Sequence, residues 1–224
     1  LLNFANMGTA GMITLLLSLP AVLIAITFHE FAHAYAADKL GDDTARLQGR
    51  LNLNPLSHTD PLGLIFLILV GFGWGRPVQI NPNRFTRKYS LFASEAIVAI
   101  AGPIMNFVLA FVFLIIFYFV QKLIPATEMG YYIVLAISRV IIINIGLGVF
   151  NLIPIPPLDG SKVLMHFLPY NAKQWFYEKE SIIYIVFIIL LIMPGSIIST
   201  IMSPIVETIF VGMDSLVNLL FGWM

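Results

Sequence analysis

The residues His29-Glu30-Phe31-Ala32-His33 combine two metal ligands with a carboxylate. Histidines four apart lie about one turn apart on one helix face, so both imidazoles could bind a single metal ion. Glu30 would lie on a neighbouring part of that surface, where it could take a proton from a water on the metal. Composition alone gives this pattern an expected count of roughly 0.002, so its occurrence favours a site over chance.

The motif lies near the end of an apolar segment. Residues 1–28 carry no charge, and residues 11–28 are rich in Leu, Ile and Ala. The length of this apolar segment is nearly sufficient for a helix to cross a bilayer. The helix is expected to continue to Ala37. Because the next charged residue after Glu30 is Asp38, Glu30 is expected on the order of 12 Å inside that helix end. Ionisable groups at such depth usually mark function, which disfavours the alternative that the histidines only satisfy local hydrogen bonds.

The composition is that of a polytopic membrane protein. The chain has 224 residues, of which 59% are hydrophobic and only 11% charged, and its mean hydropathy is +0.92. We expect a single integral-membrane domain over residues 1–224. Zero net charge without a basic block argues against nucleic acid as a partner, and the absence of Cys excludes disulfides and thiolate ligands.

Further apolar segments predict an all-α fold with about four to six such segments in total. Residues 96–121 and Tyr131–Leu152 are expected to span the membrane and, with the first helix, to form a core of three spanning helices around the metal site. Gly102-Pro103 would let another backbone approach closely. Residues 181–206 are interrupted by Pro194-Gly195, which leaves open one kinked span or a shorter span with a turn. From Ile205 the tail is expected to form an interfacial or packing helix.

Residues 62–75 are apolar but too few for a comfortable span. If they did span, one basic flank would lie outside, against the positive-inside tendency. We therefore expect residues 61–75 to form a small re-entrant or membrane-edge element, a β-hairpin or a broken helix, with both flanks cytoplasmic. Residues 50–53 are candidates for a short strand. The basic residues on the two flanks are Lys39, Arg46 and Arg50, and Arg76, Arg84, Arg87 and Lys88.

A third metal ligand is required, because catalytic zinc sites usually have three protein ligands and a water. Asp159 follows the helix predicted to end at Leu152, in a segment with three prolines, at the membrane face where the first helix also ends. A carboxylate on such a stiff segment is well suited to reach the histidines. The alternative is that Asp159-Gly160 forms a turn or caps the next helix.

The combined pattern resembles the site-2 protease family of intramembrane zinc metalloproteases, in its compact branch without PDZ or CBS domains. The resemblance joins the motif at His29 to the distal Pro-Leu-Asp-Gly ending at Gly160, and it covers nearly the whole chain. Its other parts are Gly49-Arg50-Leu51-Asn52-Leu53-Asn54-Pro55, Gly71-Phe72-Gly73-Trp74, Ala101-Gly102-Pro103, and the segment from Asn151 to Gly160.

The resemblance implies that His29, His33 and Asp159 bind one Zn²⁺ per chain and that Glu30 is the catalytic base. It also suggests that Asn151 contacts substrate or stabilises the oxyanion. The implied reaction is hydrolysis of peptide bonds within or near transmembrane helices of membrane-anchored substrates, that is, regulated intramembrane proteolysis.

The partners would be a transmembrane-helix substrate and the lipid bilayer; the sequence does not determine the oligomeric state. The protein is expected to be a multi-pass protein of a prokaryotic cell membrane with its active site toward the cytoplasmic side. Since a substrate helix hides its carbonyls in its own hydrogen bonds, it must unwind, and we expect it to pair with an edge strand from residues 47–58 or 72–82. Asn106, Asn144 and Asn151 would line a water-filled cavity open to the cytoplasm.

Two other functions compete with this interpretation. A membrane metal-ion transporter would be expected to carry ligands on several helices at different depths, often in repeats. An inactive membrane scaffold would have no need for Glu30 beside a complete set of ligands. Four further ionisable residues are expected to lie outside the site, in loops, at interfaces or in ordinary pairing: His58, His166, Glu95 and Arg139.

Overall fold

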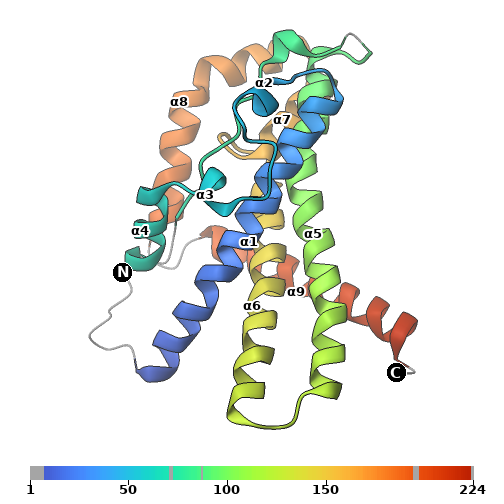
Figure 1. The fold of residues 1–224 in the computed structure, drawn as a ribbon. Coiled ribbons are helices and arrows are strands. Elements are labelled where there is room, and N and C mark those ends of the chain that lie inside the picture. The colour runs from blue at the N-terminus through green and yellow to red at the C-terminus, as the bar shows by residue number, and fades with distance from the viewer. Residues whose placement is uncertain (1–7, 71–72, 87, 194–196, 223–224) are drawn as a thin grey trace.

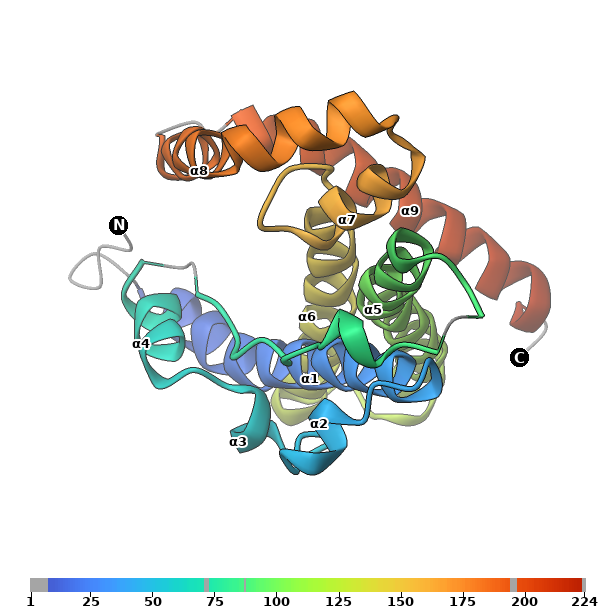
Figure 2. The ribbon, with the colours of Figure 1, turned by 90° about the horizontal axis from the view of Figure 1, so that it is seen from above.

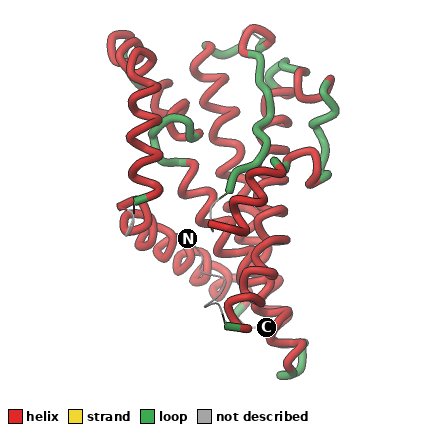
Figure 3. The backbone as a smooth tube through the Cα atoms, turned by 90° about the vertical axis from the view of Figure 1, so that its left-hand side faces the viewer, coloured by secondary structure: helices red, strands yellow, loops and turns green. Residues whose placement is uncertain are grey.

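The computed structural model describes residues 8–70, 73–86, 88–193 and 197–222. Within these ranges the chain is helical and contains no strand (Figures 1 and 3). The helices are α1 (Thr9–Lys39), α2 (Thr44–Leu47), α3 (Pro55–His58), α4 (Pro61–Val70), the 3₁₀ turn η2 (Pro82–Arg84), α5 (Leu91–Leu123), α6 (Glu128–Asn151), α7 (Asp159–Phe167), α8 (Tyr170–Ile192) and α9 (Ile197–Phe221).

Four described helices are long and apolar enough to cross a membrane by length and composition: residues Gly11–Lys39 of α1, and α5, α6 and α9. The protein is therefore an integral membrane protein, as the composition predicts. Three of these helices, α1, α5 and α6, pack directly on one another and form the centre of the molecule (Figure 1). The expected three-helix core is thus present.

Small residues let these three helices approach closely. Ala25 of α1 and Ala110 of α5 are fully buried, and a methyl group at Gly148 of α6 would lie 2.8 Å from the ring of Phe107 on α5. In a bilayer, where the hydrophobic effect does not drive helix association, such contact between backbones is a main source of stability. The packing fixes α5 against the face of α1 that carries the two histidines.

The C-terminal third differs from the expected arrangement. The break expected at Pro194-Gly195 lies outside the described residues, which give two helices on either side of it, α8 and α9. The expected packing helix in the tail is present, but it starts earlier than Ile205: α9 begins at Ile197 and passes through Pro204 without interruption. It packs on α6 and α5, with Val217 buried. Seen from above, α8 and α9 lie on the opposite side of the core from α2 and α3 (Figure 2).

The predicted β element is wrong for the described residues. Only an isolated antiparallel bridge joins Thr59 to Gly75; Gly71 and Phe72 lie outside the described part. The region consists instead of α4, whose ten residues cover about 15 Å and cannot span, and of residues 73–81, which form neither helix nor strand. The expectation of strand-edge pairing with substrate therefore loses its basis.

No strand forms among the described residues of this region because its backbone amides donate hydrogen bonds to groups outside any second strand. In residues 73–81, Val78 and Asn81 donate their amides to the carboxylates of Glu30 and Asp42, so they form no ladder with a second strand. Residues 50–53 also form no strand, and the amide of Arg50 closes a turn on Ala45 O at 2.8 Å. Carboxylates of distant segments thus accept the hydrogen bonds that a second strand would accept if the predicted edge strand were formed.

Candidate metal centre and catalytic carboxylate

Three side chains meet at the centre of the molecule. His29 and His33 share one face of α1, and Asp159 is the first residue of α7. Asp159 Oδ2 lies 3.2 Å from the Nε2 atom of each histidine, and the two Nε2 atoms are 3.0 Å apart. Both histidines are buried. The structure therefore brings together all three residues that the sequence nominates as metal ligands.

Helix α5 determines which nitrogen of each histidine faces the centre. His33 Nδ1 donates to the carbonyl of Val98 at 2.8 Å, and His29 Nδ1 donates to Asn106 Oδ1 at 2.7 Å. The orientation of the Asn106 amide follows from its own donors, since Nδ2 binds Ala25 O and Asn144 Oδ1. With Nδ1 protonated in both rings, both Nε2 atoms present lone pairs toward Asp159.

This arrangement fits a bound metal cation. Two imidazole lone pairs and a carboxylate oxygen face one another, and Asp159 Oδ2 is buried without a hydrogen-bond partner among the described residues. A buried acceptor without a donor is costly, and a cation at the point where the three atoms converge removes that cost. Two histidines and one carboxylate are a common ligand set of catalytic zinc sites.

Gly102 lets α5 lie directly against the two rings. A Cβ atom at this position would lie 2.5 Å from His33 Nε2 and 2.6 Å from His29 Cε1. The close backbone approach expected at Gly102-Pro103 is therefore found, and it is found at the metal centre. No other residue type would leave this space for the imidazoles.

Asp159 reaches the histidines through a tight return of the chain after α6. A Cβ at Gly160 would overlap the backbone of Leu152 and Ile153, so only glycine lets α7 begin against the end of α6. The N-cap position of α7 is Leu158, and Asp159 makes no capping bond; the capping alternative is therefore wrong.

Glu30 follows His29 directly in α1, and its carboxylate is hydrogen-bonded by a residue of the segment between α4 and η2. Its Oε2 atom accepts the backbone amide of Val78 at 2.8 Å. The side chain is half-buried. A carboxylate next to the metal ligands, with one oxygen fixed, is suited to move a proton.

The remaining predicted residues have other surroundings. Asn151 donates to Leu147 O of its own helix at 3.0 Å, so its role toward substrate stays a prediction. Asn106 and Asn144 are fully buried and hydrogen-bonded, so the expectation that they line an open cavity is wrong. His58 is buried and bonds Asn52 O at 2.8 Å, away from the ligand set.

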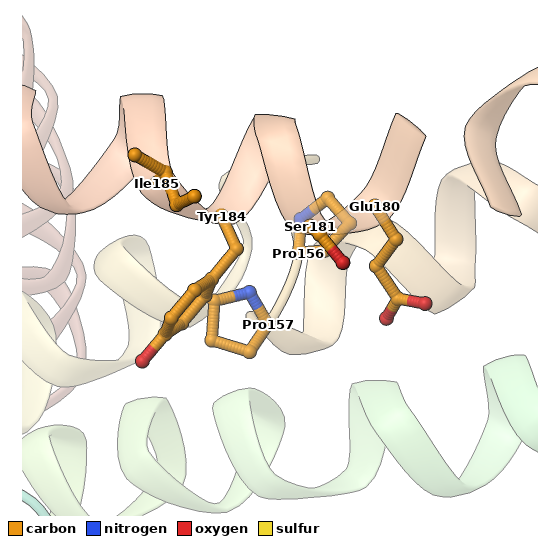
Figure 4. Close-up of a pocket in the computed structure, with 6 residues that line it drawn as sticks. All are labelled: Pro156, Pro157, Glu180, Ser181, Tyr184 and Ile185. Carbon is orange, nitrogen blue, oxygen red and sulfur yellow. The ribbon is translucent and has the colours of Figure 1, made fainter. Parts of the chain in front are cut away.

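His166 is exposed against Phe167, and Glu95 is half-buried near the start of α5. Arg139 has no carboxylate within 4.0 Å among the described residues. A cavity of about 270 Å³ separates the loop at Pro156 and Pro157 from α8 and contains none of the ligands; its other lining residues are Glu180, Ser181, Tyr184 and Ile185 (Figure 4).

Sequence reasoning missed the groups that hold the site. Asn106 and Asn144 stand out as amides in apolar helices, but only the contact between α5 and α1 assigns them to His29. Val98 and Val78 act through backbone atoms, for which the sequence carries no signal.

Comparisons with known proteins agree with this geometry. The chain matches the model of peptidase family M50 over residues 18–141 and 128–194. It is 38% identical over 202 residues to "Putative zinc metalloprotease YwhC" of Bacillus subtilis, covering 88% of each chain. It is 32% identical over 186 residues to "Putative zinc metalloprotease Rip2" of Mycolicibacterium smegmatis, covering 77% of this chain and 65% of the relative. No solved structure is significantly similar to the chain. The chain therefore belongs to peptidase family M50, the site-2 protease family of zinc metallopeptidases.

Proposed function

We propose that this protein is an intramembrane zinc endopeptidase that cleaves membrane-anchored proteins within or near their transmembrane helices. One observation carries the proposal: His29, His33 and Asp159 converge inside the membrane-spanning core with Glu30 beside them. Glu30 precedes the end of α1 at Lys39 by nine residues, about 14 Å along the helix. A peptide bond cleaved here would lie below the membrane surface.

The residues have distinct roles in this reaction. His29, His33 and Asp159 would hold zinc, which when bound lowers the pKa of a water toward neutrality and polarises the scissile carbonyl. Glu30 takes the proton from the attacking water and returns it to the leaving amine. The acceptors on α5, Asn106 and the carbonyl of Val98, keep the histidines in the ligand-competent tautomer.

The position of the site in the membrane-spanning core also bears on how a substrate reaches it and on the orientation of the protein in the membrane. A transmembrane substrate must unwind before its carbonyl can reach the site, because its backbone groups are otherwise paired within the helix. Basic residues gather beyond the end of α1 that carries the site, at Lys39, Arg46 and Arg50, which supports a cytoplasmic orientation for that end. The bacterial relatives support a prokaryotic cell membrane as the location.

Cleavage of a model transmembrane substrate by purified, zinc-loaded protein tests the proposal. The wild type should cleave, and Glu30→Gln should lose cleavage by about 10²- to 10⁴-fold at equal zinc content, because the proton transfer is lost. Equal cleavage by the two proteins would remove Glu30 from the mechanism. No cleavage of several substrates, together with zinc uptake into vesicles containing the protein, would replace the protease proposal with transport.

A further inference from the structure

We propose that residues 75–81, called the strap below, are a fixed part of the active site that orients Glu30, and that Arg50 is the positioning residue that holds them there. The proposal deepens the proposed function and rests on it. It assigns to the strap the orientation of Glu30, in place of the edge strand expected within residues 72–82.

The central contact joins one peptide group to two charged side chains. The amide of Val78 donates to Glu30 Oε2 at 2.8 Å. The carbonyl of the same peptide group, Pro77 O, faces Arg50 Nη1 at 3.4 Å, and Arg50 Nη2 donates to Arg76 O at 2.7 Å. A guanidinium on the carbonyl side and a carboxylate on the amide side polarise the peptide in the same sense, which strengthens both contacts.

The strap is anchored on both sides of Val78. Upstream, the amide of Arg76 donates to His58 O at 2.8 Å. Downstream, the amide of Asn81 donates to Asp42 Oδ2 at 2.6 Å, and Asp42 is fully buried. Val78 itself is buried against Ala34. A segment held at both ends by buried groups, with its middle residue packed on α1, belongs to the site and is not a displaceable cover.

Arg50 has no carboxylate within 4.0 Å in the described chain, although it is only 7% exposed. Burial lowers the pKa of its guanidinium, and the negative charge of Glu30 acts in the opposite direction. The cation thus lies in an unfavourable environment and directs its two Nη groups to the carbonyls that precede Val78. The planar fork binds the two successive carbonyls through two separate nitrogens in a fixed geometry, whereas an ammonium group has a single nitrogen on a flexible stem.

The consequence for the reaction is specific. The contact with Val78 holds Oε2, which in this proposal leaves the other oxygen of Glu30 to take the proton from the water. Loss of this contact should lower kcat and leave KM nearly unchanged, because the substrate does not bind through Glu30. Loss of comparable outer partners in metalloenzymes costs about 10- to 100-fold, and we expect that range here.

The sharpest test removes one N–H. Replacing Val78 by the α-hydroxy acid analogue of valine turns the Pro77–Val78 peptide into an ester and keeps the side chain. The matched control is the same change at Gln79, whose amide donates no hydrogen bond to another described residue. In the zinc-loaded full chain, the ester at Val78 should lower kcat 10- to 100-fold at unchanged zinc content, and the ester at Gln79 should lower it less than threefold.

A second readout does not depend on activity. Reversible unfolding in mixed micelles is measured for the wild type, the Val78 ester, Glu30→Ala and their combination. If the contact exists, the ester raises the unfolding equilibrium constant about tenfold with Glu30 present and far less in Glu30→Ala. Arg50→Lys keeps the charge and should still lose most of kcat, as should Arg50→Gln.

The outcomes are distinguishable. Coupled unfolding together with a selective loss of kcat supports the proposal. Additive unfolding effects, full kcat in the Val78 ester, or full kcat in Arg50→Lys would each overturn it while leaving the protease assignment intact. A wild type that cleaves no substrate would refute the proposed function and this catalytic role with it, whatever the unfolding cycle reports about the contact.

Discussion

Replacement of Gly102 by alanine should disable the metal centre through one added methyl group. The new Cβ would lie 2.5 Å from His33 Nε2 and 2.6 Å from His29 Cε1, whereas ordinary contact begins at 3.4 Å. Either the imidazole rings or the backbone of α5 must therefore move by about 0.9 Å to restore ordinary contact. The rings cannot withdraw freely, because their Nδ1 atoms are hydrogen-bonded to Asn106 and Val98 on the same helix as the methyl.

The size of the effect follows from this displacement. Ligand distances in a metal site tolerate about 0.2 Å, so a shift several times larger removes at least one ligand from its position. Overpacking of a tight interior costs about 1–3 kcal/mol, which corresponds to about 5- to 150-fold when the strain falls on the bound state. We therefore expect Gly102→Ala to weaken zinc binding by about 100-fold, with a corresponding loss of cleavage at limiting zinc.

The assay is competition for zinc with a chromophoric chelator in detergent micelles, followed by cleavage of a model substrate. Gly146→Ala is the matched control, because a Cβ at Gly146 meets no atom within 4 Å and the residue lies in another core helix, α6. Zinc affinity of Gly102→Ala within about threefold of the control would refute the packing argument, since the methyl would then have been accommodated without displacing a ligand.

Three further changes test other parts of the structure. Asn106→Leu removes the acceptor of His29 Nδ1 and should weaken zinc binding about 10- to 100-fold in the same competition assay; unchanged affinity would show that α5 does not orient this ligand. Gly160→Ala forces the start of α7 away from Leu152 and should lower zinc affinity similarly, while unaltered affinity would contradict the tight return. Burial lowers the pKa of His58 below its ordinary value of about 6.5, so the stability held by its neutral form is complete above that pH and is lost as the pH falls toward the lowered pKa. His58→Gln should flatten this loss in acid unfolding curves, and an unchanged pH slope would exclude His58 as its source.

The ligand set could be predicted because it depends on local rules. The spacing of His29 and His33 follows from helix geometry, their depth follows from the apolar run, and Asp159 follows from which helices end at the same membrane face. For Asp159 this reasoning leaves a turn or a helix cap as the alternative, and the resemblance to the site-2 protease family assigns it as a ligand. The structure brings these residues together without any correction to their identity.

The groups that orient those ligands could not be predicted, for a common physical reason. Asn106 is 77 residues from His29 in the sequence, and Val78 is 48 residues from Glu30. Their roles depend on which atoms face each other after packing. Residues 72–82 are expected to supply an edge strand, yet the amides of Val78 and Asn81 bind carboxylates on distant elements. Local propensity therefore fails to predict the partners of these backbone groups.

Both packed helices and hydrogen-bonded loops position the residues of the site. Helix α5 supplies the acceptors for both histidines and, at Gly102, the space for their rings, so the geometry on α1 depends directly on how closely these two helices pack. The other two groups, Asp159 and Glu30, depend on Gly160 and on the strap. A metal ion held by His29, His33 and Asp159 would join α1 to α7, and its binding would stabilise the contact between these two elements. Loss of a support of the ligands, such as Asn106 or Gly160, should therefore weaken metal binding, whereas loss of the contact between Val78 and Glu30 should lower catalysis at unchanged metal content.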